Sequence, residues 1–333
     1  MPLLRRASFI SPRRLTSAAV SLLALTIILY LGYSSISIWT SPQRFSASPP
    51  SRSLVVASLG RENTKWIRQH FPDLDAFVYV VDDPHANLTT PKNKGNEAMT
   101  YLTYIIDHYD TLSDVSIFVH AHRGAKHNDE LLDGSMVHTL QRLRDDYVVQ
   151  QGYFNLRCSW EPGCPAALDL YKPVVESSEQ EIKMKNEWQR LHPGVPLPGS
   201  LAQPCCAQFA ASRSRIQSIP RKKWVHFRDW LLETDLDNYH SGRIWEYNWQ
   251  FVLAGQPVFC PAMHTCYCEG YGVCFGSGEK FKMWWEQWTA VHQLFRDYLG
   301  LKAAGAEDLE LRQRIEDENE RLRRVLEGAK RPY

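Results

Sequence analysis

The stretch over residues 91–123 constrains the fold of this chain more than any other part of the sequence. Apolar residues recur at helical spacing over residues 98–109, which predicts a helix with a buried face. After a short loop, the dense apolar run over 115–119 predicts a strand that is covered on both faces. A helix followed at once by such a strand is typical of a parallel sheet in an α/β protein.

The start of the predicted helix favours an anion. Lys92 and Lys94 precede Gly95, and Asn96 is suited to cap the helix. Unpaired backbone N–H groups and the helix dipole both point towards such a position, and they attract negative charge.

Two further strands are predicted upstream, over residues 54–58 and 76–81, with a helix between them over 62–71. The order strand, helix, strand, helix, strand predicts a mostly parallel central sheet flanked by helices. Ligands of such sheets bind just beyond the carboxyl ends of the strands. Asp82-Asp83 and His120-Ala121-His122 follow two of these strands, so they are the first candidates for a site.

The second half of the chain offers fewer regular patterns. A small apolar strand is predicted within residues 204–213, and helices are predicted over 224–232 and 245–253. We expect residues 54–300 to form one domain and 301–333 a charged helix. That helix carries a thin apolar stripe, which we expect to pack on its own domain; a dimeric coiled coil is the alternative. The stripe consists of Leu311, Ile315, Leu322 and Val325.

The N-terminus predicts a membrane anchor. Residues 15–40 contain no charged side chain and exceed the ~20 residues that cross a bilayer. Four arginines lie within residues 1–14, which predicts a cytosolic tail and a lumenal domain, the type II arrangement. A cleaved signal peptide is the competing interpretation. The Ser/Pro-rich residues 41–53 are typical of a flexible stem, and we expect a Golgi or ER location.

The cysteines and the charge agree with a lumenal domain. All eight cysteines follow the anchor, and an even number in an oxidising compartment predicts disulfides. A metal site at His264, Cys266 and Cys268 is the alternative. Asn87 begins the only glycosylation sequon. The net charge of +1 offers no basic surplus for phosphates, so we expect no nucleic-acid partner.

Long motifs between Leu54 and Phe275 resemble a family of fungal proteins known as the domain of unknown function 3431. The motifs are VVAS, PKNKGNEAMTYLTYIIDHY, IFVHAHR with HND after it, GYFNLRC, CCAQFAASRSRI and WEYNWQ. This resemblance implies membership of the family and carries no activity with it.

The order of the parts is also similar to the GT-A glycosyltransferase fold. In that fold the second strand ends in Asp-Asp, Asn-Lys-Gly opens a helix, and the next strand ends in a metal-binding Asp-x-Asp. Here Asp82-Asp83 and Asn93-Lys94-Gly95 match the first two features, and His120-Ala121-His122 stands in place of the third.

The GT-A resemblance implies an enzyme that uses a nucleotide-sugar donor and a glycan or small-molecule acceptor. Glu246 would be the general base that takes the proton of the acceptor. His120 and His122 would hold a divalent metal such as Mn²⁺ or Zn²⁺, or His122 and Arg123 would neutralise the diphosphate directly. The remaining substrate-binding residues that it implies are Asp82, Asp83, Lys92, Asn93, Lys94, Gly95, Gln208 and Arg213.

Each candidate has a structural alternative. The two histidines would also suit packing under a loop, Asp82-Asp83 a turn before proline, and Lys92 and Lys94 a solvated loop. Glu246 would then pair with an arginine such as Arg213. Two other classes of function stay open: a non-catalytic binding or scaffold protein on a degenerate transferase fold, and a zinc-dependent hydrolase. The hydrolase would use His120, His122, His127 and Asp129.

Overall fold

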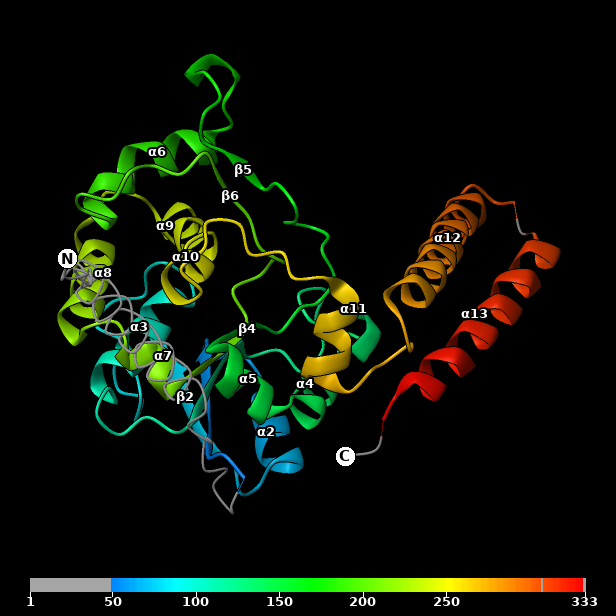
Figure 1. The fold of residues 1–333 in the computed structure, drawn as a ribbon, viewed down its shortest axis with the longest axis horizontal. Coiled ribbons are helices and arrows are strands. Elements are labelled where there is room, and N and C mark those ends of the chain that lie inside the picture. The colour runs from blue at the N-terminus through cyan, green and yellow to red at the C-terminus, as the bar shows by residue number, and fades with distance from the viewer. Residues whose placement is uncertain (1–48, 307, 332–333) are drawn as a thin grey trace, which may run out of the picture. The chain divides into compact units, whose positions relative to one another are not determined.

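The computed structural model describes residues 49–306 and 308–331. The predicted cytosolic tail, the predicted anchor and most of the predicted stem therefore lie outside the described residues. No helix within the described ranges is long and apolar enough to cross a membrane. The described chain is a mixed α/β fold in which helices flank a five-stranded sheet (Figure 1).

The sheet has the strand order β2-β1-β3-β7-β4. Strands β1 (Arg52–Ser58), β2 (Asp75–Val80) and β3 (Val115–His120) run parallel, and all three coincide with predicted apolar runs. Strand β7 (Phe209–Ser212) runs antiparallel to both β3 and β4 (Tyr153–Asn155). The sheet is therefore mixed, and the predicted parallel arrangement is correct only for the half that contains β1, β2 and β3.

Two hydrophobic cores contain the alternate side chains of the central strands. Val56 of β1 and Ile117 of β3 belong to one core, together with buried residues of α2 (Lys65–His70) and α4 (Met136–Arg142). Their chain neighbours Val55 and Phe118 belong to the other core. Successive side chains of a strand point to opposite faces, so helices must cover both faces of this sheet.

Helix α3 (Ala98–Asp107) confirms the predicted central helix, but its start differs from the prediction. It is buried from Ala98 to Ile106, on every side rather than along one stripe, because it contacts β1, α8 (Arg221–Glu233) and α9 (Asn238–Glu246). Asn96 does not cap it. Asn96 has a φ of +52°, and its backbone N–H donates to Asn238 Oδ1 at 2.9 Å.

The predicted helix over 245–253 is two helices. Helix α9 ends at Glu246, and α10 (Trp249–Leu253) begins three residues later. Between them lies Asn248, whose buried side chain donates to the carbonyl of Ile244 at 2.7 Å. An asparagine that bonds to the backbone in this way competes with a continuous helix. The break matters for the site because it places Glu246 at the end of a helix.

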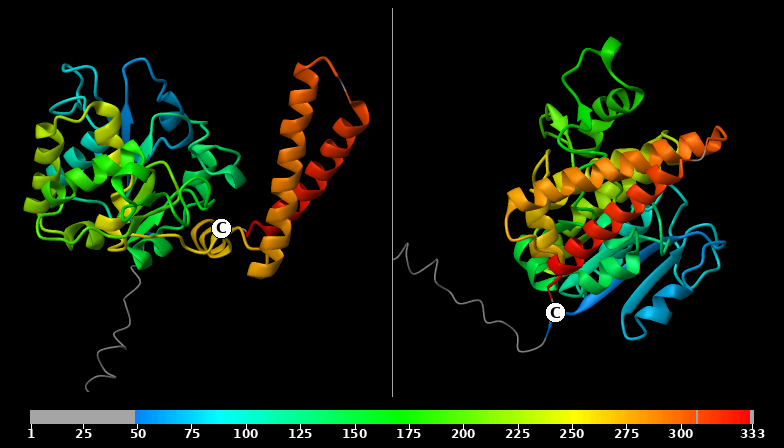
Figure 2. Two further views of the ribbon diagram at one scale, coloured as in Figure 1. Left: turned by 90° about the horizontal axis from the view of Figure 1, so that it is seen from above. Right: turned by 90° about the vertical axis from the view of Figure 1, so that its right-hand side faces the viewer.

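Helices α12 (Gly278–Ala303) and α13 (Leu309–Ala329) lie side by side (Figure 2). Helix α13 lies within the range of the predicted charged helix and packs against α12, which was not predicted. Ile315, Leu322 and Leu326 are buried, whereas Val325 of the predicted stripe is 45% exposed.

The shorter elements complete the described chain. They are η1 (Glu130–Leu132), α5 (Asp145–Gln151), β5 (Leu168–Asp169), η2 (Val174–Glu176), α6 (Glu179–Leu191), β6 (Ser200–Leu201), α7 (Arg213–Gln217), α11 (Met263–Thr265) and η3 (Cys266–Gly270). Disulfides join Cys158 to Cys266, Cys164 to Cys260, Cys205 to Cys206 and Cys268 to Cys274. The predicted disulfides are confirmed, and the alternative of a metal site at Cys266 and Cys268 is wrong.

Candidate functional site

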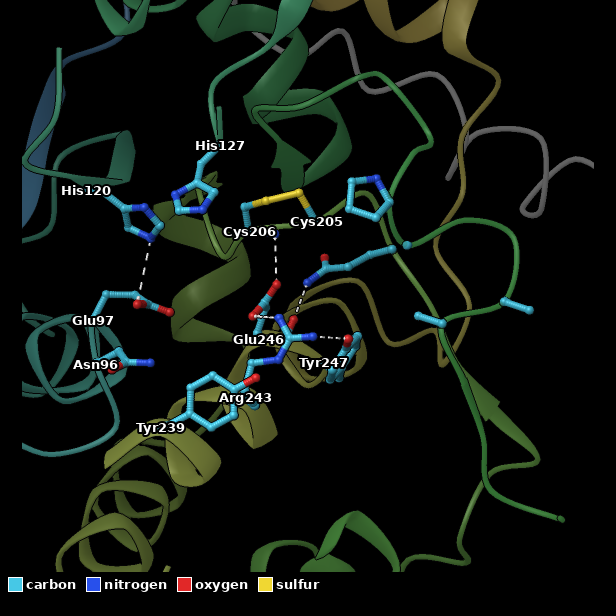
Figure 3. Close-up of a pocket in the computed structure, with 15 residues that line it drawn as sticks. Asn96, Glu97, His120, His127, Cys205, Cys206, Tyr239, Arg243, Glu246 and Tyr247 are labelled. Carbon is cyan, nitrogen blue, oxygen red and sulfur yellow. Dashed lines mark hydrogen bonds and ion pairs between the residues drawn. A yellow bond between two sulfur atoms is a disulfide. The ribbon is translucent and has the colours of Figure 1, made fainter. Parts of the chain in front are cut away.

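A cavity of about 610 Å³ opens at the carboxyl end of β3, and we call it the β3 pocket. Its lining comes from the residues before α3, the end of β3, the loops around residues 162–167 and 203–206, and α9. The polar groups that matter most for chemistry are Glu97, His120, His127, Arg243 and Glu246, which Figure 3 shows, together with Gln203. The predicted position beyond the end of this strand is therefore hollow and polar.

Glu97 and His120 face each other across one side of the pocket. Glu97 Oε2 lies 3.7 Å from His120 Nε2, which is too long for a hydrogen bond. Burial raises the pKa of Glu97 to about 8, and the nearby negative charge of Glu246 adds to this effect. Burial also lowers the pKa of His120 to about 3, with smaller contributions from His127 and His122. Both side chains are therefore neutral near pH 7.

His120 Nε2 is buried and has no hydrogen-bond partner among the described residues. A buried polar atom without a partner costs free energy, and such atoms cluster at sites that bind a ligand or water. Glu97 keeps 13% of its side chain accessible from the pocket. The two groups are therefore candidates to contact a ligand that enters the pocket.

Gln208 holds the two histidines in place. Its Oε1 accepts the backbone N–H of His120 at 3.0 Å, and its Nε2 donates to Asn128 Oδ1 at 3.0 Å and to the carbonyl of His127 at 3.3 Å. The rings of His120 and His127 meet edge to face at 5.4 Å. Gln208, predicted to contact the substrate, is buried behind the pocket wall and positions groups that line it.

Glu246 lies on the opposite side of the pocket, between a helix and a loop. Its Oε2 pairs with Arg243 Nη1 at 2.5 Å, one helical turn earlier in α9. Its Oε1 accepts the backbone N–H of Cys206 at 3.3 Å, and its own carbonyl accepts a bond from Gln203 Nε2 at 2.6 Å. Arg243 also bonds to the hydroxyl of Tyr247. These contacts fix the direction of the carboxylate.

The disulfide between the neighbouring residues Cys205 and Cys206 forms part of the pocket wall (Figure 3). Cys206 has a φ of +91° and the next residue, Ala207, a φ of +48°. Positive φ is uncommon for residues with a Cβ. The adjacent cysteines are visible in the sequence, but nothing local in it indicates that they pair with each other.

The acidic pair at the end of β2 lies outside the lining of the β3 pocket. Asp82 and Asp83 are exposed. Asp82 Oδ1 accepts the backbone N–H of Gly60 at 2.8 Å, and Asp83 Oδ1 accepts that of His85 at 2.9 Å. Both therefore organise loops at the carboxyl ends of β1 and β2, on the same edge of the sheet as His120.

The segment before α3, which was predicted to bind an anion, divides into two parts. Lys92 and Asn93 are exposed, whereas Lys94 is buried and donates to the carbonyl of Thr234 after α8. Burial lowers the pKa of Lys94. Gly95 has a φ of +73°, and a Cβ there would lie 2.6 Å from Leu231 of α8. Lys94 and Gly95 thus anchor this loop on α8.

His120 and His122 do not converge. His122 Nε2 lies 3.6 Å from Glu62 Oε1, and half of the His122 side chain is exposed. Within the described ranges, no three His, Cys, Asp or Glu side chains are grouped so that they could hold a metal ion. Arg123 is exposed beside His122.

Two further predicted residues have structural contacts. Arg213 pairs with Asp114 at 3.2 Å, at the opposite end of β3 from His120, so the arginine partner of Glu246 is Arg243 instead. Asp129 is buried and accepts bonds from Tyr267 Oη at 3.0 Å and from the backbone N–H of Cys158 at 2.9 Å. Asn87 is exposed, as a glycosylation site requires.

Glu97, Gln203 and Arg243 were missed in the sequence analysis. The spacing of Arg243 and Glu246, one helical turn apart, is a signal that could have indicated their pairing. Glu97 gave no such signal, because its importance comes from burial.

A family model described as "Protein of unknown function (DUF3431)" matches residues 54–269. This range contains β1, β2, β3, β4, β7 and every residue that lines the β3 pocket. No curated protein and no solved structure matches the chain. Because the model matches more than half of the sequence, the chain belongs to the DUF3431 family.

Proposed function

We propose that the β3 pocket is the active site of an enzyme that transfers a glycosyl group from a nucleotide-sugar donor to a hydroxyl group of a glycan or small-molecule acceptor. The observation that carries this proposal is the carboxylate of Glu246, which faces a polar pocket and is fixed there by Arg243 and by the backbone of Cys206. A fixed carboxylate of this kind can take the proton of an acceptor hydroxyl as its oxygen attacks the sugar.

The arrangement of the first three strands supports a GT-A-like organisation. β1, β2, α3 and β3 follow each other in the order expected from that resemblance, and the polar residues lie at the carboxyl edge of the parallel strands. The exposed Asp82, Asp83, Lys92 and Asn93 are available on this edge for the nucleotide, and Arg123 is available for its phosphates.

A resident metal fits this site poorly. His120 Nε2 faces Glu97 and His122 Nε2 faces Glu62, so the two histidines do not share one ligand position. We therefore derive no step through a metal ion. The charge of a leaving diphosphate would instead be neutralised by basic side chains such as Arg123 and Lys92.

We also propose that the enzyme is a type II membrane protein of the secretory pathway with its domain in the Golgi or ER lumen. Four disulfides within the described residues support an oxidising compartment, where such bonds persist. The exposed Asn87 supports a glycan at its sequon.

The first test is a thermal-shift titration of the purified protein with UDP, GDP and CMP, each with and without Mn²⁺ or Zn²⁺. A ligand at ~100 times its dissociation constant stabilises the protein by about 2.7 kcal/mol, which a melting curve detects. A shift with one nucleotide identifies the class of donor. No shift with any nucleotide contradicts the proposal.

The second test is Glu246→Gln, assayed with the donor that the titration identifies. Loss of a general base lowers the turnover rate by roughly 10²- to 10⁴-fold, while nucleotide binding persists. Glu233→Gln is the matched control, because Glu233 is an exposed glutamate at the end of α8 and should leave turnover unchanged. Full turnover in Glu246→Gln would contradict the assigned role.

A second candidate function is hydrolysis of a glycosidic bond. The observation in its favour is that Glu97, whose pKa burial raises to about 8, lines the same pocket as Glu246. Glycosidases use two carboxyl groups in one pocket, of which one has a raised pKa and acts as the acid. Sugar release without any nucleotide, abolished by both Glu97→Gln and Glu246→Gln, would favour this function over transfer.

A further inference from the structure

The Cys205–Cys206 disulfide is a feature of the β3 pocket that the proposed reaction leaves unexplained. The other three disulfides join cysteines that are 108, 96 and 6 positions apart. A disulfide stabilises a fold mainly by restricting the unfolded chain, and this effect grows with the length of the loop that it closes. Neighbouring cysteines close no such loop, so their bond contributes little to global stability. Its effect must be local.

The local effect concerns the backbone. Cys206 and Ala207 have φ values of +91° and +48°. Residues with a Cβ keep such values only where their surroundings hold them there. The disulfide joins the side chains of Cys205 and Cys206 in a small ring, which restricts the peptide bond between them. Opening the ring removes the covalent restraint on the conformation of Cys206.

This conformation directs the backbone N–H of Cys206 to Glu246. The N–H donates to Oε1 at 3.3 Å, while the other carboxylate oxygen pairs with Arg243. Both cysteines are only partly buried and line the pocket, so a small reagent can reach them. By contrast, Cys158 and Cys266 are 1% and 3% exposed; the other four cysteines are partly buried but lie outside the pocket lining.

We propose that the Cys205–Cys206 disulfide positions the carboxylate of Glu246, and that its reduction by a dithiol lowers the activity of the pocket. The proposal rests on the function proposed for Glu246. A thiolate of the dithiol attacks one of the two sulfurs, the protein S–S bond breaks, and a mixed disulfide forms. The second thiol of the reductant then displaces the bound cysteine. Two electrons and two protons pass to the protein, which gains two thiols, and the reductant leaves as a cyclic disulfide.

The test treats the intact protein with increasing dithiothreitol and alkylates the freed thiols with iodoacetamide for peptide mass spectrometry. We expect Cys205 and Cys206 to be alkylated before the buried Cys158 and Cys266. At that stage kcat should fall by about tenfold or more, because Glu246 loses a charge-assisted hydrogen bond. KM should change less. In a portion that is reduced but not alkylated, reoxidation should restore kcat. Unchanged kcat in that portion, once both thiols are free, would overturn the proposal.

Variants separate positioning from a general loss of structure. Cys205→Ser with Cys206→Ser should reproduce the low kcat and shift the pH profile of kcat. Cys205→Ser with Cys206→Gly should recover most of the lost rate, because glycine adopts positive φ without steric cost, and it should no longer respond to dithiothreitol. Cys268→Ser with Cys274→Ser removes a short-range disulfide outside the pocket lining. This control should keep the kcat of the unchanged protein, and its kcat should still fall on treatment with dithiothreitol. Equal rates in the serine and glycine pairs would contradict the backbone mechanism.

Amide hydrogen exchange at Cys206 separates failure of this proposal from failure of the proposed function. Exchange should become at least about tenfold faster on reduction, because the N–H loses its bond to Glu246. Faster exchange in a protein without transferase activity would keep the positioning role and refute only the reaction. Unchanged exchange after reduction would overturn the positioning role, whatever the activity.

Discussion

Glu97→Gln should flatten the dependence of stability on pH above pH 6.5. The carboxyl group of Glu97 has an ordinary pKa of 4.5 and a pKa of about 8 in the fold, because burial disfavours its charged form. Between these values the folded protein keeps a proton that the unfolded chain releases. The free energy of unfolding therefore falls as pH rises through this range. Glutamine cannot ionise, so the variant lacks this fall.

The magnitude follows from the width of the window. Each pH unit lowers the free energy of unfolding by about 1.4 kcal/mol, so the loss from pH 6.5 to pH 8 is about 2 kcal/mol. The comparison with Glu97→Gln isolates Glu97 from three other buried groups. Burial lowers the pKa values of His120 and His192 from 6.5 to about 3 and about 4, so their effect on stability ends only about one pH unit above 6.5, but it is the same in both proteins. Burial raises the pKa of Asp129 to about 6, so its contribution ends below the window.

The assay is urea unfolding at pH 6.5 and pH 8 with the disulfides intact, followed by tryptophan fluorescence. Between the two pH values the free energy of unfolding should fall by about 2 kcal/mol more in the protein than in Glu97→Gln. Glu233→Gln, which removes an exposed carboxyl group, should behave like the unchanged protein. Equal slopes for the unchanged protein and Glu97→Gln would refute the assignment of a protonated Glu97.

Three further substitutions test how the fold holds the site, each by urea unfolding. Gly95→Ala places a Cβ 2.6 Å from Leu231 at a φ of +73°, so we expect the free energy of unfolding to fall by roughly 2–4 kcal/mol. Its control is Gly194→Ala, which has a similar φ of +75° but open space around the new Cβ, and whose free energy of unfolding should fall by only about 1 kcal/mol. The buried guanidinium of Arg157 donates hydrogen bonds to three backbone carbonyls. Arg157→Met leaves these carbonyls without donors and should lower the free energy of unfolding by about 3 kcal/mol. Gln208→Met should cost about 2 kcal/mol and also weaken ligand binding, because both pocket histidines lose their support; unchanged binding would contradict that role.

Much of the sheet could be predicted because its signals are local. The apolar runs of β1 and β2 indicate strands, the run of β3 is dense enough to require cover on both faces, and the helix before β3 has a matching apolar pattern. The antiparallel direction of β7 could not be predicted. It depends on how the long segment after β4 returns to the sheet, and no residue of Phe209–Ser212 encodes a direction.

The candidate site was predicted in part. His120 lies in the lining of the β3 pocket, as expected from its place at the end of a strand. Glu246, which the GT-A resemblance implied, also lines the pocket, and Gln208, from the same resemblance, lies behind its wall. Lys94 and Arg213 do not, because a long side chain reaches whichever acceptor the fold brings near it. For Lys94 that acceptor is the carbonyl of Thr234, and for Arg213 it is Asp114.

The sequence by itself determined the class of fold, the family, the presence of disulfides and the edge of the sheet where a site would lie. These properties depend on hydrophobic periodicity, on the number of cysteines and on the order of motifs, all of which can be read from the sequence before the chain folds. Only the tertiary structure decided that Glu97 is protonated, that Arg243 is the partner of Glu246, and that Cys205 pairs with Cys206. A pKa shift, an ion pair and a disulfide pairing depend on burial and on distances between segments, which exist only once the chain has folded.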